Sequence, residues 1–501
     1  MTTISIKELM TQGQVPFGTS GARGLVENLT DKLVYGLCLG FAKYMLKTGD
    51  ILPGGALSLA GDLRPSSPRI LNTCAQAIID AGCTPDYQGL IPSPAIALWG
   101  LTHKRPSLMV TGSHIPADRN GIKFNKTAGE ILKEDEQGLS AQIIELPEDL
   151  FDEKGGWKSI PPALPKPSGS AAQLYMQRYI DAFGTGFLTG LYLGFYEHSA
   201  VGRDLLPNLL EQLGAQVSRL DRSTSFVPVD TEAIRPEDVE LAKNWAKEGN
   251  YFAFFSTDGD SDRPLIGDEK GQWLRGDSAG ILTAQYLKAD AVVAPVSCNS
   301  ALEKCGSFTS CIRTKIGSPY VIEGLIQAET QGNTRVVGYE ANGGFFIQTP
   351  LHLATEAADP LLAPLPTRDP VIVLLGILGL AKEKNCALSK LNESLPPRFG
   401  ASGRLQDFPT QLSSQILEAL LKDSLPNNLQ AIHQKLGGTL ALPVSYTTTD
   451  GLRVHLQNLD IIHLRPSGNA PEFRCYTESA SPEQAVTLLQ HTLKLMESWR
   501  A

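Results

Sequence analysis

A single pattern recurs three times along this chain of 501 residues: a strand-like apolar run, a short loop rich in glycine, serine or charge, an amphipathic helical run, and a second strand-like run. The copies span residues 56–89, 191–221 and 308–340. Each copy has the length and periodicity of a unit made of a β-strand, an α-helix and a β-strand. The repetition predicts three α/β domains of related build.

Serine-proline pairs and glycines mark the expected ends of the helices in these units. Ser67-Pro68 and Ser318-Pro319 each supply a capping serine and a first-turn proline, which favour the start of a helix. The glycines that stand where the three helices should stop are Gly82, Gly214 and Gly332.

Stretches rich in proline and glycine divide the chain at 159–170, near Asp277 and at 392–403. Beyond the last stretch, a polar helix, a β-rich segment and a closing helix from about Ser481 indicate a smaller α+β domain. The sequence therefore predicts three related α/β domains and a C-terminal α+β domain, at 1–165, 166–276, 277–395 and 396–501.

The charge balance limits the classes of partner. A formal net charge of -9 and an isoelectric point near 5.5 argue against nucleic acid or an anionic membrane, because both are held mainly by clustered Lys and Arg. An anionic substrate must then be bound by a local group of cations. Oligomeric state is left open between monomer and dimer.

The cysteines and the apolar runs indicate a cytoplasmic protein. None of the eight cysteines forms a CxxC pair or has zinc-ligand spacing, so we expect reduced, buried thiols. The first residues lack the apolar core of a signal peptide. The run at 371–381 is too short to span a bilayer, and we expect a buried helix there, capped by Asp369 with Pro370 at its first position.

The segment TGSHIPADRNGIKF, residues 111–124, places a serine and a histidine side by side after a strand-like run. A small residue before Ser113 exposes its hydroxyl, and His114 and Lys123 can assist its deprotonation or bind an anion beside it. The segment lacks the GxSxG context of a hydrolase. A nucleophilic serine and a plain surface turn both remain open from these residues alone.

The segment STDGDSDRP, residues 256–264, carries Asp258, Asp260 and Asp262 at alternate positions after a strand-like run. Three clustered carboxylates repel one another unless a cation lies between them. A calcium loop is the rival interpretation, with Glu269 at its twelfth position, but Arg263 stands where such a loop requires glycine. Magnesium with a phosphoryl ligand fits better than calcium or a solvated acidic turn.

Three further loops carry polar residues suited to a sugar phosphate. Residues 465–473, RPSGNAPEF, combine guanidinium, hydroxyl, amide and backbone N–H donors that suit a phosphate. Residues 338–346, GYEANGGFF, place Glu340 and Asn342 on a glycine-rich turn suited to sugar hydroxyls. Residues 17–24, FGTSGARG, place Arg23 in a third such loop. Each segment alone is also compatible with an ordinary turn.

Together and in this order, the five segments resemble the α-D-phosphohexomutases over nearly the whole chain. The resemblance implies four domains around a central cleft and a phosphoserine that exchanges its phosphoryl group with a hexose phosphate. It also implies Mg²⁺ as cofactor and a hexose 1,6-bisphosphate as activator and intermediate.

Carried over to this sequence, the resemblance implies a role for each residue. Ser113 corresponds to the phosphoserine, Lys123 to the general acid or base, and His114 and Arg23 to residues that steady the transferring phosphoryl group. The implied metal ligands are Ser113, Asp258, Asp260 and Asp262. The implied substrate contacts are Arg263, Lys315, Glu340, Asn342, Arg465, Ser467, Gly468 and Asn469.

The predicted function is therefore that of an intramolecular phosphotransferase acting on hexose phosphates, with phosphomannomutase as the first choice. The sugar loop YEANGGFF differs from the motifs of the glucose, mannose and glucosamine members. Phosphoglucomutase and phospho(acetyl)glucosamine mutase remain alternatives. A catalytically silent relative that only binds sugar phosphates is the alternative outside enzymes.

Overall fold

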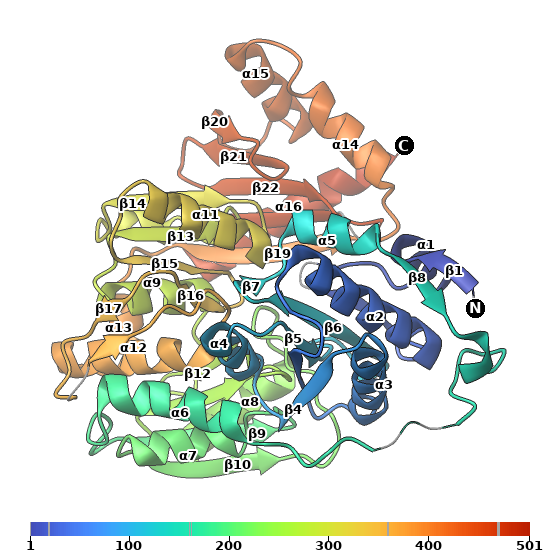
Figure 1. The fold of residues 1–501 in the computed structure, drawn as a ribbon. Coiled ribbons are helices and arrows are strands. Elements are labelled where there is room, and N and C mark those ends of the chain that lie inside the picture. The colour runs from blue at the N-terminus through green and yellow to red at the C-terminus, as the bar shows by residue number, and fades with distance from the viewer. Residues whose placement is uncertain are drawn as a thin grey trace. The chain divides into compact units, whose positions relative to one another are not determined.

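The computed structural model describes residues 2–18, 21–159, 161, 163–357, 360–467 and 471–500. Its helices and sheets confirm the predicted α/β class (Figure 1). The chain forms two compact units: Met1–Asp290 with Gly317–Asn392, and Ala291–Ile316 with Glu393–Ala501. The division into four domains stays a prediction.

The first sheet of the larger unit contains the serine segment. Its strand order is β2 (Ala22–Leu25), β6 (Arg119–Lys126), β5 (Ser107–Val110), β3 (Ala56–Gly61), β4 (Thr84–Leu90), with β7 (Gly129–Glu130) paired to β6. Strand β3 runs parallel to β4 and β5, whereas β6 runs antiparallel to β5 and β2. The carboxyl ends of β3 and β5 therefore lie at one edge of the sheet.

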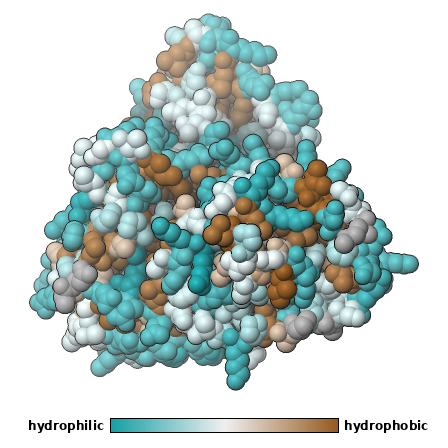
Figure 2. Space-filling view, viewed as in Figure 1, coloured by the Kyte–Doolittle hydropathy of each residue, from teal (hydrophilic) through white to brown (hydrophobic). Residues whose placement is uncertain are grey.

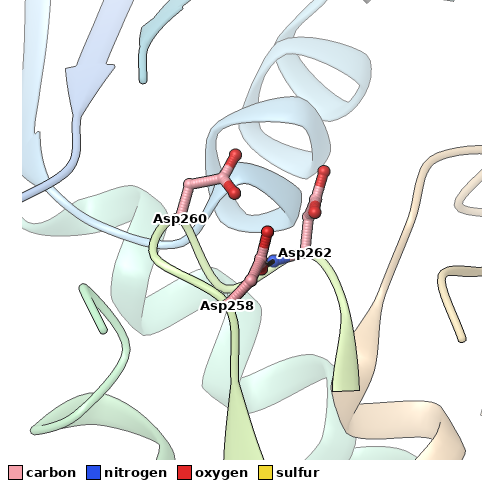
Figure 3. A group of neighbouring side chains, drawn as sticks. All are labelled: Asp258, Asp260 and Asp262. Atoms are coloured by element: carbon pink, nitrogen blue, oxygen red, sulfur yellow. Dashed lines mark hydrogen bonds between the residues drawn. The ribbon is translucent and has the colours of Figure 1, made fainter. Parts of the chain in front are cut away.

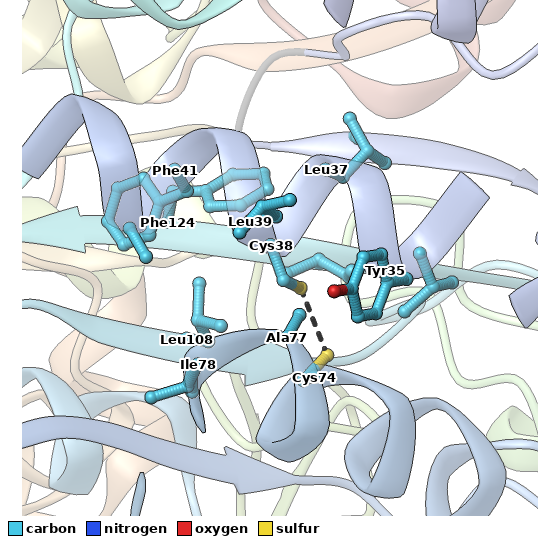
Figure 4. Close-up of a cluster of buried hydrophobic side chains, with 14 of the residues drawn as sticks. Tyr35, Leu37, Cys38, Leu39, Phe41, Cys74, Ala77, Ile78, Leu108 and Phe124 are labelled. Atoms are coloured by element: carbon cyan, nitrogen blue, oxygen red, sulfur yellow. Dashed lines mark hydrogen bonds between the residues drawn. The ribbon is translucent and has the colours of Figure 1, made fainter. Parts of the chain in front are cut away.

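Helices α2 (Asp31–Thr48) and α3 (Ser67–Asp80) pack on this sheet through a buried apolar cluster (Figure 4). Leu108 and Phe124 enter the cluster from β5 and β6, and the rings of Phe41 and Phe124 lie 5.0 Å apart. The other elements of this part are β1 (Thr2–Ser5), α1 (Ile6–Gln12), α4 (Ser93–His103), α5 (Lys133–Ser140), β8 (Ile143–Leu146) and the 3₁₀ turn Glu148–Leu150.

The second sheet contains the aspartate segment. Its order is β10 (Gln216–Arg222), β9 (Tyr192–His198), β11 (Ala253–Thr257), β12 (Pro264–Gly267). Strands β11 and β12 are antiparallel, with Thr257 opposite Pro264, so residues 258–263 form the connection between them. The helices of this region are α6 (Ser170–Phe183), α7 (Leu205–Gln212) and α8 (Pro236–Glu248).

The rest of the larger unit contains the sugar segment, between the antiparallel strands β15 (Val336–Tyr339) and β16 (Phe345–Ile347). Helix α12 (Pro370–Lys384) confirms the predicted buried helix, because Asp369 caps it by accepting from the N–H of Val371. The remaining elements are α9 (Gly276–Tyr286), α11 (Ser318–Thr330), β17 (Leu351–His352), β18 (Leu361–Leu362) and α13 (Leu388–Glu393).

The smaller unit contains an antiparallel sheet in the order β19 (Phe399–Leu405), β23 (Phe473–Ser479), β22 (Ile461–Pro466), β21 (Leu452–Leu456), β20 (Pro443–Thr447). Strands β13 (Ala291–Pro295) and β14 (Ser310–Thr314) pair in parallel. The helices are α10 (Ala301–Lys304), α14 (Thr410–Ala419), α15 (Leu425–Lys435), α16 (Pro482–Glu497) and the 3₁₀ turn Ser498–Arg500. Helix α16 begins after Ser481, as predicted.

The helix stops were predicted correctly, and so were the two starts with their first-turn prolines, but not the capping role of the two serines. Gly82, Gly214 and Gly332 follow α3, α7 and α11 with positive φ angles of 75°, 100° and 92°, the conformation that ends a helix. Ser67 and Ser318 do not cap. They are the first residues of their helices, and their hydroxyls donate instead to buried carboxylates, of Asp62 at 2.6 Å and of Glu130 at 2.7 Å.

Five of the eight cysteines are buried. The described helices include none with the length and apolar character needed to cross a membrane. Hydrophilic and hydrophobic residues are intermingled over the face seen in Figure 2.

Candidate functional site

The serine loop, residues 111–116, leaves the carboxyl end of β5. Ser113 is fully buried. Its φ is 53°, in the left-handed region that residues other than glycine and asparagine rarely adopt. Its N–H donates to the hydroxyl of Thr111 at 2.7 Å, and its Oγ donates to Oδ2 of Asp258 at 2.5 Å. The strained turn therefore aims the serine hydroxyl at the aspartate segment.

Arg64 holds the main chain of this loop. The residue is buried, and its two terminal nitrogens donate to the carbonyl oxygens of Ser113, Ile115, Pro116 and Arg119 at 2.8, 2.6, 2.6 and 2.8 Å. Its Nε lies 3.2 Å from Oδ2 of Asp62. A Cβ at Gly112 would lie 2.5 Å from the Cζ of Arg64, so the glycine makes room for the guanidinium.

Sequence reasoning missed Arg64, although a usable pattern was present. The segment DLRPSSP, residues 62–68, follows β3 as the serine loop follows β5. Since these parallel neighbours end at the same edge of the sheet, an Asp-x-Arg after one strand can reach the loop after the other.

The metal loop, residues 258–263, brings its three aspartates together. Asp258, Asp260 and Asp262 are buried and offer ligand oxygens that lie within 4.8 Å of one another. Their carboxyl groups lie on the same side of the loop (Figure 3). Oδ1 of Asp258 accepts from the N–H groups of Asp262 and Arg263 at 3.1 and 3.2 Å, which closes the loop.

The charges of the triad are balanced in part by Lys123, on β6. Its ammonium lies 2.6 Å from Oδ2 of Asp260 and 2.5 Å from Oδ2 of Asp262. Although burial lowers the pKa of Lys123, these two carboxylates raise it overall. Burial and the neighbouring carboxylates raise the pKa of Asp258 well above its usual range. Burial also raises the pKa of Asp260, but Lys123 outweighs it and lowers that pKa.

The triad fits a divalent cation. Oδ1 of Asp260 and Oδ1 of Asp262 are buried and have no hydrogen-bond partner among the described residues. Buried carboxylate oxygens normally have a partner, and one left without is costly. With the Ser113 hydroxyl at Asp258, the donors are all oxygens, which Mg²⁺ prefers.

Two arginines near the triad are suited to a phosphoryl group. Nε of Arg23, on β2, and Nε of Arg263 are buried without a hydrogen-bond partner among the described residues. Burial and the charge of Arg263 lower the pKa of Arg23 to about 10. Burial also lowers the pKa of Arg263, but the carboxylates of Asp262 and Asp258 raise it overall, so both side chains are cations at neutral pH. Unpaired guanidinium donors beside a serine can bind the oxygens of a phosphate.

His114 completes the group around the serine. Its Nδ1 lies 3.4 Å from Ser113 Oγ. Burial, with the charges of Arg263 and Arg23, lowers the pKa of His114 well below its usual range. The imidazole is therefore neutral and can exchange a hydrogen bond with the serine or with a group bound to it.

In the sugar loop, residues 340–344, the side chains predicted to bind the sugar form hydrogen bonds and an ion pair with other residues of the protein. Oε2 of Glu340 pairs with Nε of Arg368 at 2.5 Å. Oδ1 of Asn342 accepts from the N–H of Gly344 at 2.9 Å, and its backbone oxygen accepts from the hydroxyl of Thr231 at 2.7 Å. Both side chains are nearly buried. Sequence reasoning also missed Arg368, which precedes helix α12.

The larger unit thus brings together eight predicted residues, Arg23, Ser113, His114, Lys123, Asp258, Asp260, Asp262 and Arg263, with Glu340 joined to Asp262 through Arg368. Ser93, at the start of α4, is a further partner that sequence reasoning missed, because its hydroxyl donates to Oδ2 of Asp260 at 2.6 Å.

The other predicted substrate contacts belong to the smaller unit. Nε of Arg465, on β22, donates to Oδ2 of Asp450 at 2.8 Å, and the same oxygen accepts from the N–H of Ile316 at 3.0 Å. Lys315 is exposed beside Ile316. Ser467 is buried, with its N–H bonded to the oxygen of Glu472 at 2.9 Å. Gly468 and Asn469 lie outside the described residues.

Two family models match the chain. They are described as "Phosphoglucomutase/phosphomannomutase, alpha/beta/alpha domain I", at residues 14–149, and the corresponding "domain III", at residues 275–399. The chain is 40% identical over 491 residues to a phosphomannomutase of Salmonella muenchen, covering 98% of this chain and 97% of that protein. It is 38% identical over 482 residues to a phosphomannomutase of Sinorhizobium fredii, covering 96% and 98%.

A solved structure has a similar fold. It is a phosphoglucomutase/phosphomannomutase family protein of Burkholderia thailandensis, with a TM-score of 0.71, 19% identity and coverage of 96% of this chain and 97% of that one. At this identity the likeness concerns the fold alone.

Proposed function

This chain belongs to the phosphoglucomutase/phosphomannomutase family, and we propose that it interconverts mannose 1-phosphate and mannose 6-phosphate through a phosphoserine at Ser113. One observation carries the proposal. The Ser113 hydroxyl lies 2.5 Å from a carboxylate of the buried aspartate triad, beside two guanidinium groups with unpaired donors. Phosphoryl transfer depends on such positioning and charge neutralisation around one oxygen.

The reaction consists of two transfers. In the first, the bond between phosphorus and Ser113 Oγ breaks, phosphorus bonds to the oxygen of the free hydroxyl of the sugar phosphate, and the proton of that hydroxyl is in net terms transferred to Ser113 Oγ. The products are a hexose 1,6-bisphosphate and an unphosphorylated serine. The bisphosphate turns around and returns its other phosphoryl group to Ser113. A trace of bisphosphate therefore activates any Ser113 that has lost its phosphoryl group.

The side chains of the site divide this work. We assign proton transfer to Lys123, as the acid toward Ser113 Oγ in one direction and as the base in the other. Arg23 and His114 steady the transferring phosphoryl group. Arg263 is assigned to the substrate. Arg64 keeps the serine loop in its strained turn through main-chain contacts, without bonding to the Ser113 hydroxyl.

Asp258, Asp260 and Asp262, with an oxygen of Ser113, would hold Mg²⁺. When bound, the cation supplies positive charge that stabilises the phosphoryl group during transfer.

The substrate contacts complete the proposal. Arg465, Ser467, Gly468 and Asn469, with Lys315, bind the phosphate that is not being transferred, and Glu340 and Asn342 bind the sugar. The similarity to two phosphomannomutases supports mannose over the other hexoses. The unpaired groups around Ser113 support an enzyme over a silent sugar-phosphate-binding relative. We place the protein in the cytoplasm.

Initial rates test this function. The 1-phosphates of mannose, glucose, glucosamine and N-acetylglucosamine are each assayed with Mg²⁺ and a trace of bisphosphate, beside Ser113→Ala. We expect the largest kcat/KM for mannose 1-phosphate and no turnover by the variant. A folded protein that converts none of the four sugars contradicts the proposal, and a clear preference for another sugar changes the substrate.

A further inference from the structure

Arg368 is a buried cation that joins two loops of the site. Its Nε lies 2.5 Å from Oε2 of Glu340, in the sugar loop, and Nη1 lies 3.8 Å from Oδ2 of Asp262, in the metal loop. Its side chain is 5% exposed. Burial lowers the pKa of Arg368, but the carboxylates of Glu340, Asp262 and Glu130 raise it overall, so it stays charged.

The sugar loop is built to admit this side chain. A Cβ at Gly344 would lie 2.7 Å from both Cγ and Cδ of Arg368, so only glycine leaves room for its aliphatic stem. This contact explains why the second glycine of the pair in YEANGGFF is a glycine. Gly344 carries no side chain because Arg368 occupies the space.

The backbone of Arg368 is fixed from the other side by the next residue. The N–H of Asp369 donates to the oxygen of Phe345 at 3.0 Å. The Asp369 carboxylate accepts from the hydroxyls of Tyr175, at 2.7 Å, and Tyr179. The hydrogen bonds of Asp369 therefore fix the backbone of Arg368 beside Phe345, the residue that follows the sugar loop. The guanidinium of Arg368 keeps little conformational freedom.

Arg368 also faces the metal loop together with Lys123. Both side chains line one small cavity with Ser93, Asn125, Glu130 and Asp262. Asp262 thus faces three cations, Lys123 at 2.5 Å, Arg263 at 3.7 Å and Arg368 at 3.8 Å. Of these cations, Arg368 is the one whose ion pair with Glu340 joins the sugar loop to Asp262.

We propose that Arg368 is a positioning residue that holds Glu340 for sugar recognition and couples the sugar loop to the metal loop. The inference rests on the proposed function in one part only, the identity of Glu340 as a sugar contact. With Oε2 held by Arg368, the other oxygen of Glu340 is oriented toward a sugar hydroxyl, and the orientation discriminates between epimers.

The first test compares sugars. Arg368→Lys, Arg368→Gln, Glu340→Gln and the double variant Arg368→Gln/Glu340→Gln are assayed with mannose 1-phosphate and glucose 1-phosphate, beside Arg222→Gln. Arg222 is the control outside the site: like Arg368 it lies near two carboxylates, Asp204 at 2.7 Å and Glu197 at 3.6 Å, but its own side chain is exposed. Melting temperatures are measured for every variant.

We expect the ratio of the two kcat/KM values to change by about tenfold in Arg368→Gln and Glu340→Gln. The double variant should show no further change, because the two residues act as one unit. Arg368→Lys keeps the charge but not the geometry, and should resemble Arg368→Gln. A merely structural role predicts a different result. The kcat/KM values for both sugars would fall by the same factor, and the double variant would recover both activity and melting temperature. That result would overturn the proposal.

The second test needs no turnover. Mn²⁺ affinity is measured by titration of the wild type and of the double variant, in which the loss of Arg368 is matched by the loss of the Glu340 charge. Removing a cation beside Asp262 should tighten Mn²⁺ binding by at least about threefold. An unchanged Kd contradicts the coupling. If the affinity shifts but the wild type converts no sugar phosphate, the coupling stands, whereas the sugar-recognition part falls with the proposed function.

Discussion

The serine loop and the sugar loop are held in opposite ways. In the serine loop, Arg64 binds the main-chain carbonyls, and the Ser113 side chain is left for Asp258. In the sugar loop, the side chains are the supports, because Glu340 pairs with Arg368 and Asn342 bonds to Gly344. A side-chain substitution in the serine loop can therefore remove activity and leave the loop conformation in place. A side-chain substitution in the sugar loop changes both substrate binding and the loop conformation.

The largest expected effect is the loss of turnover in Ser113→Ala, by at least about 1,000-fold. The loop should keep its shape because Arg64 binds its carbonyls, and the free energy of unfolding should fall by about 1–3 kcal/mol, the cost of the lost hydrogen bond to the buried carboxylate of Asp258. Rates and denaturant unfolding check both statements. A variant as inactive as expected but strongly destabilised would show that the hydroxyl itself supports the loop.

Arg64→Met should lower the free energy of unfolding by about 3–5 kcal/mol, because it leaves the buried Asp62 without its cation. Turnover should fall as well, since the serine loop loses the three hydrogen bonds that Arg64 donates to its carbonyl groups. Urea unfolding measures the loss. The control is Arg64→Met/Asp62→Asn, which should recover part of the stability and none of the activity. A loss below about 1 kcal/mol in the single variant would argue against the clamp.

Removal of Mg²⁺ tests the metal loop, which contacts both the serine loop, through Asp258, and Arg368 of the sugar loop's support, through Asp262. Chelation should abolish turnover. Mg²⁺ at 100 times its Kd should raise the free energy of unfolding by about 2.7 kcal/mol, because only the folded triad binds it. Thermal unfolding with and without Mg²⁺ measures the difference. Asp258→Asn is the matched control, and an equal stabilisation of that variant would place the cation elsewhere.

Asn342→Ala should have the smallest effect on stability, about 0.5–1.5 kcal/mol, from the lost bond to the N–H of Gly344. Unlike Ser113→Ala, it should also raise KM for the sugar phosphate. Gln177→Ala, which removes a 2.6 Å bond to Asp181 on the exposed face of α6, is the control. A normal KM with reduced stability would show that Asn342 stabilises the turn and does not contact the sugar.

The sequence is most informative where a pattern is local. The three strand-helix-strand units, their glycine stops and the cap of α12 follow from spacing and from residue type. The five loops could be found because each contains its own polar residues. Arg64 and Arg368 could not, since each acts on a loop about 49 or 28 residues away in the sequence. Ser67 and Ser318 were misassigned for the same reason, because their partners are buried carboxylates from other elements.

The most direct test of the central claim is the intact mass of the protein after incubation with mannose 1,6-bisphosphate and Mg²⁺. We predict that the wild type gains the mass of one phosphoryl group, that fragment spectra place it on Ser113, and that an isotope-labelled phosphoryl group on Ser113 is replaced by an unlabelled one when excess mannose 1-phosphate turns over. Ser113→Ala should gain nothing. No gain in the folded wild type, or an equal gain in the variant, would contradict the assignment of Ser113 as the residue that carries the phosphoryl group.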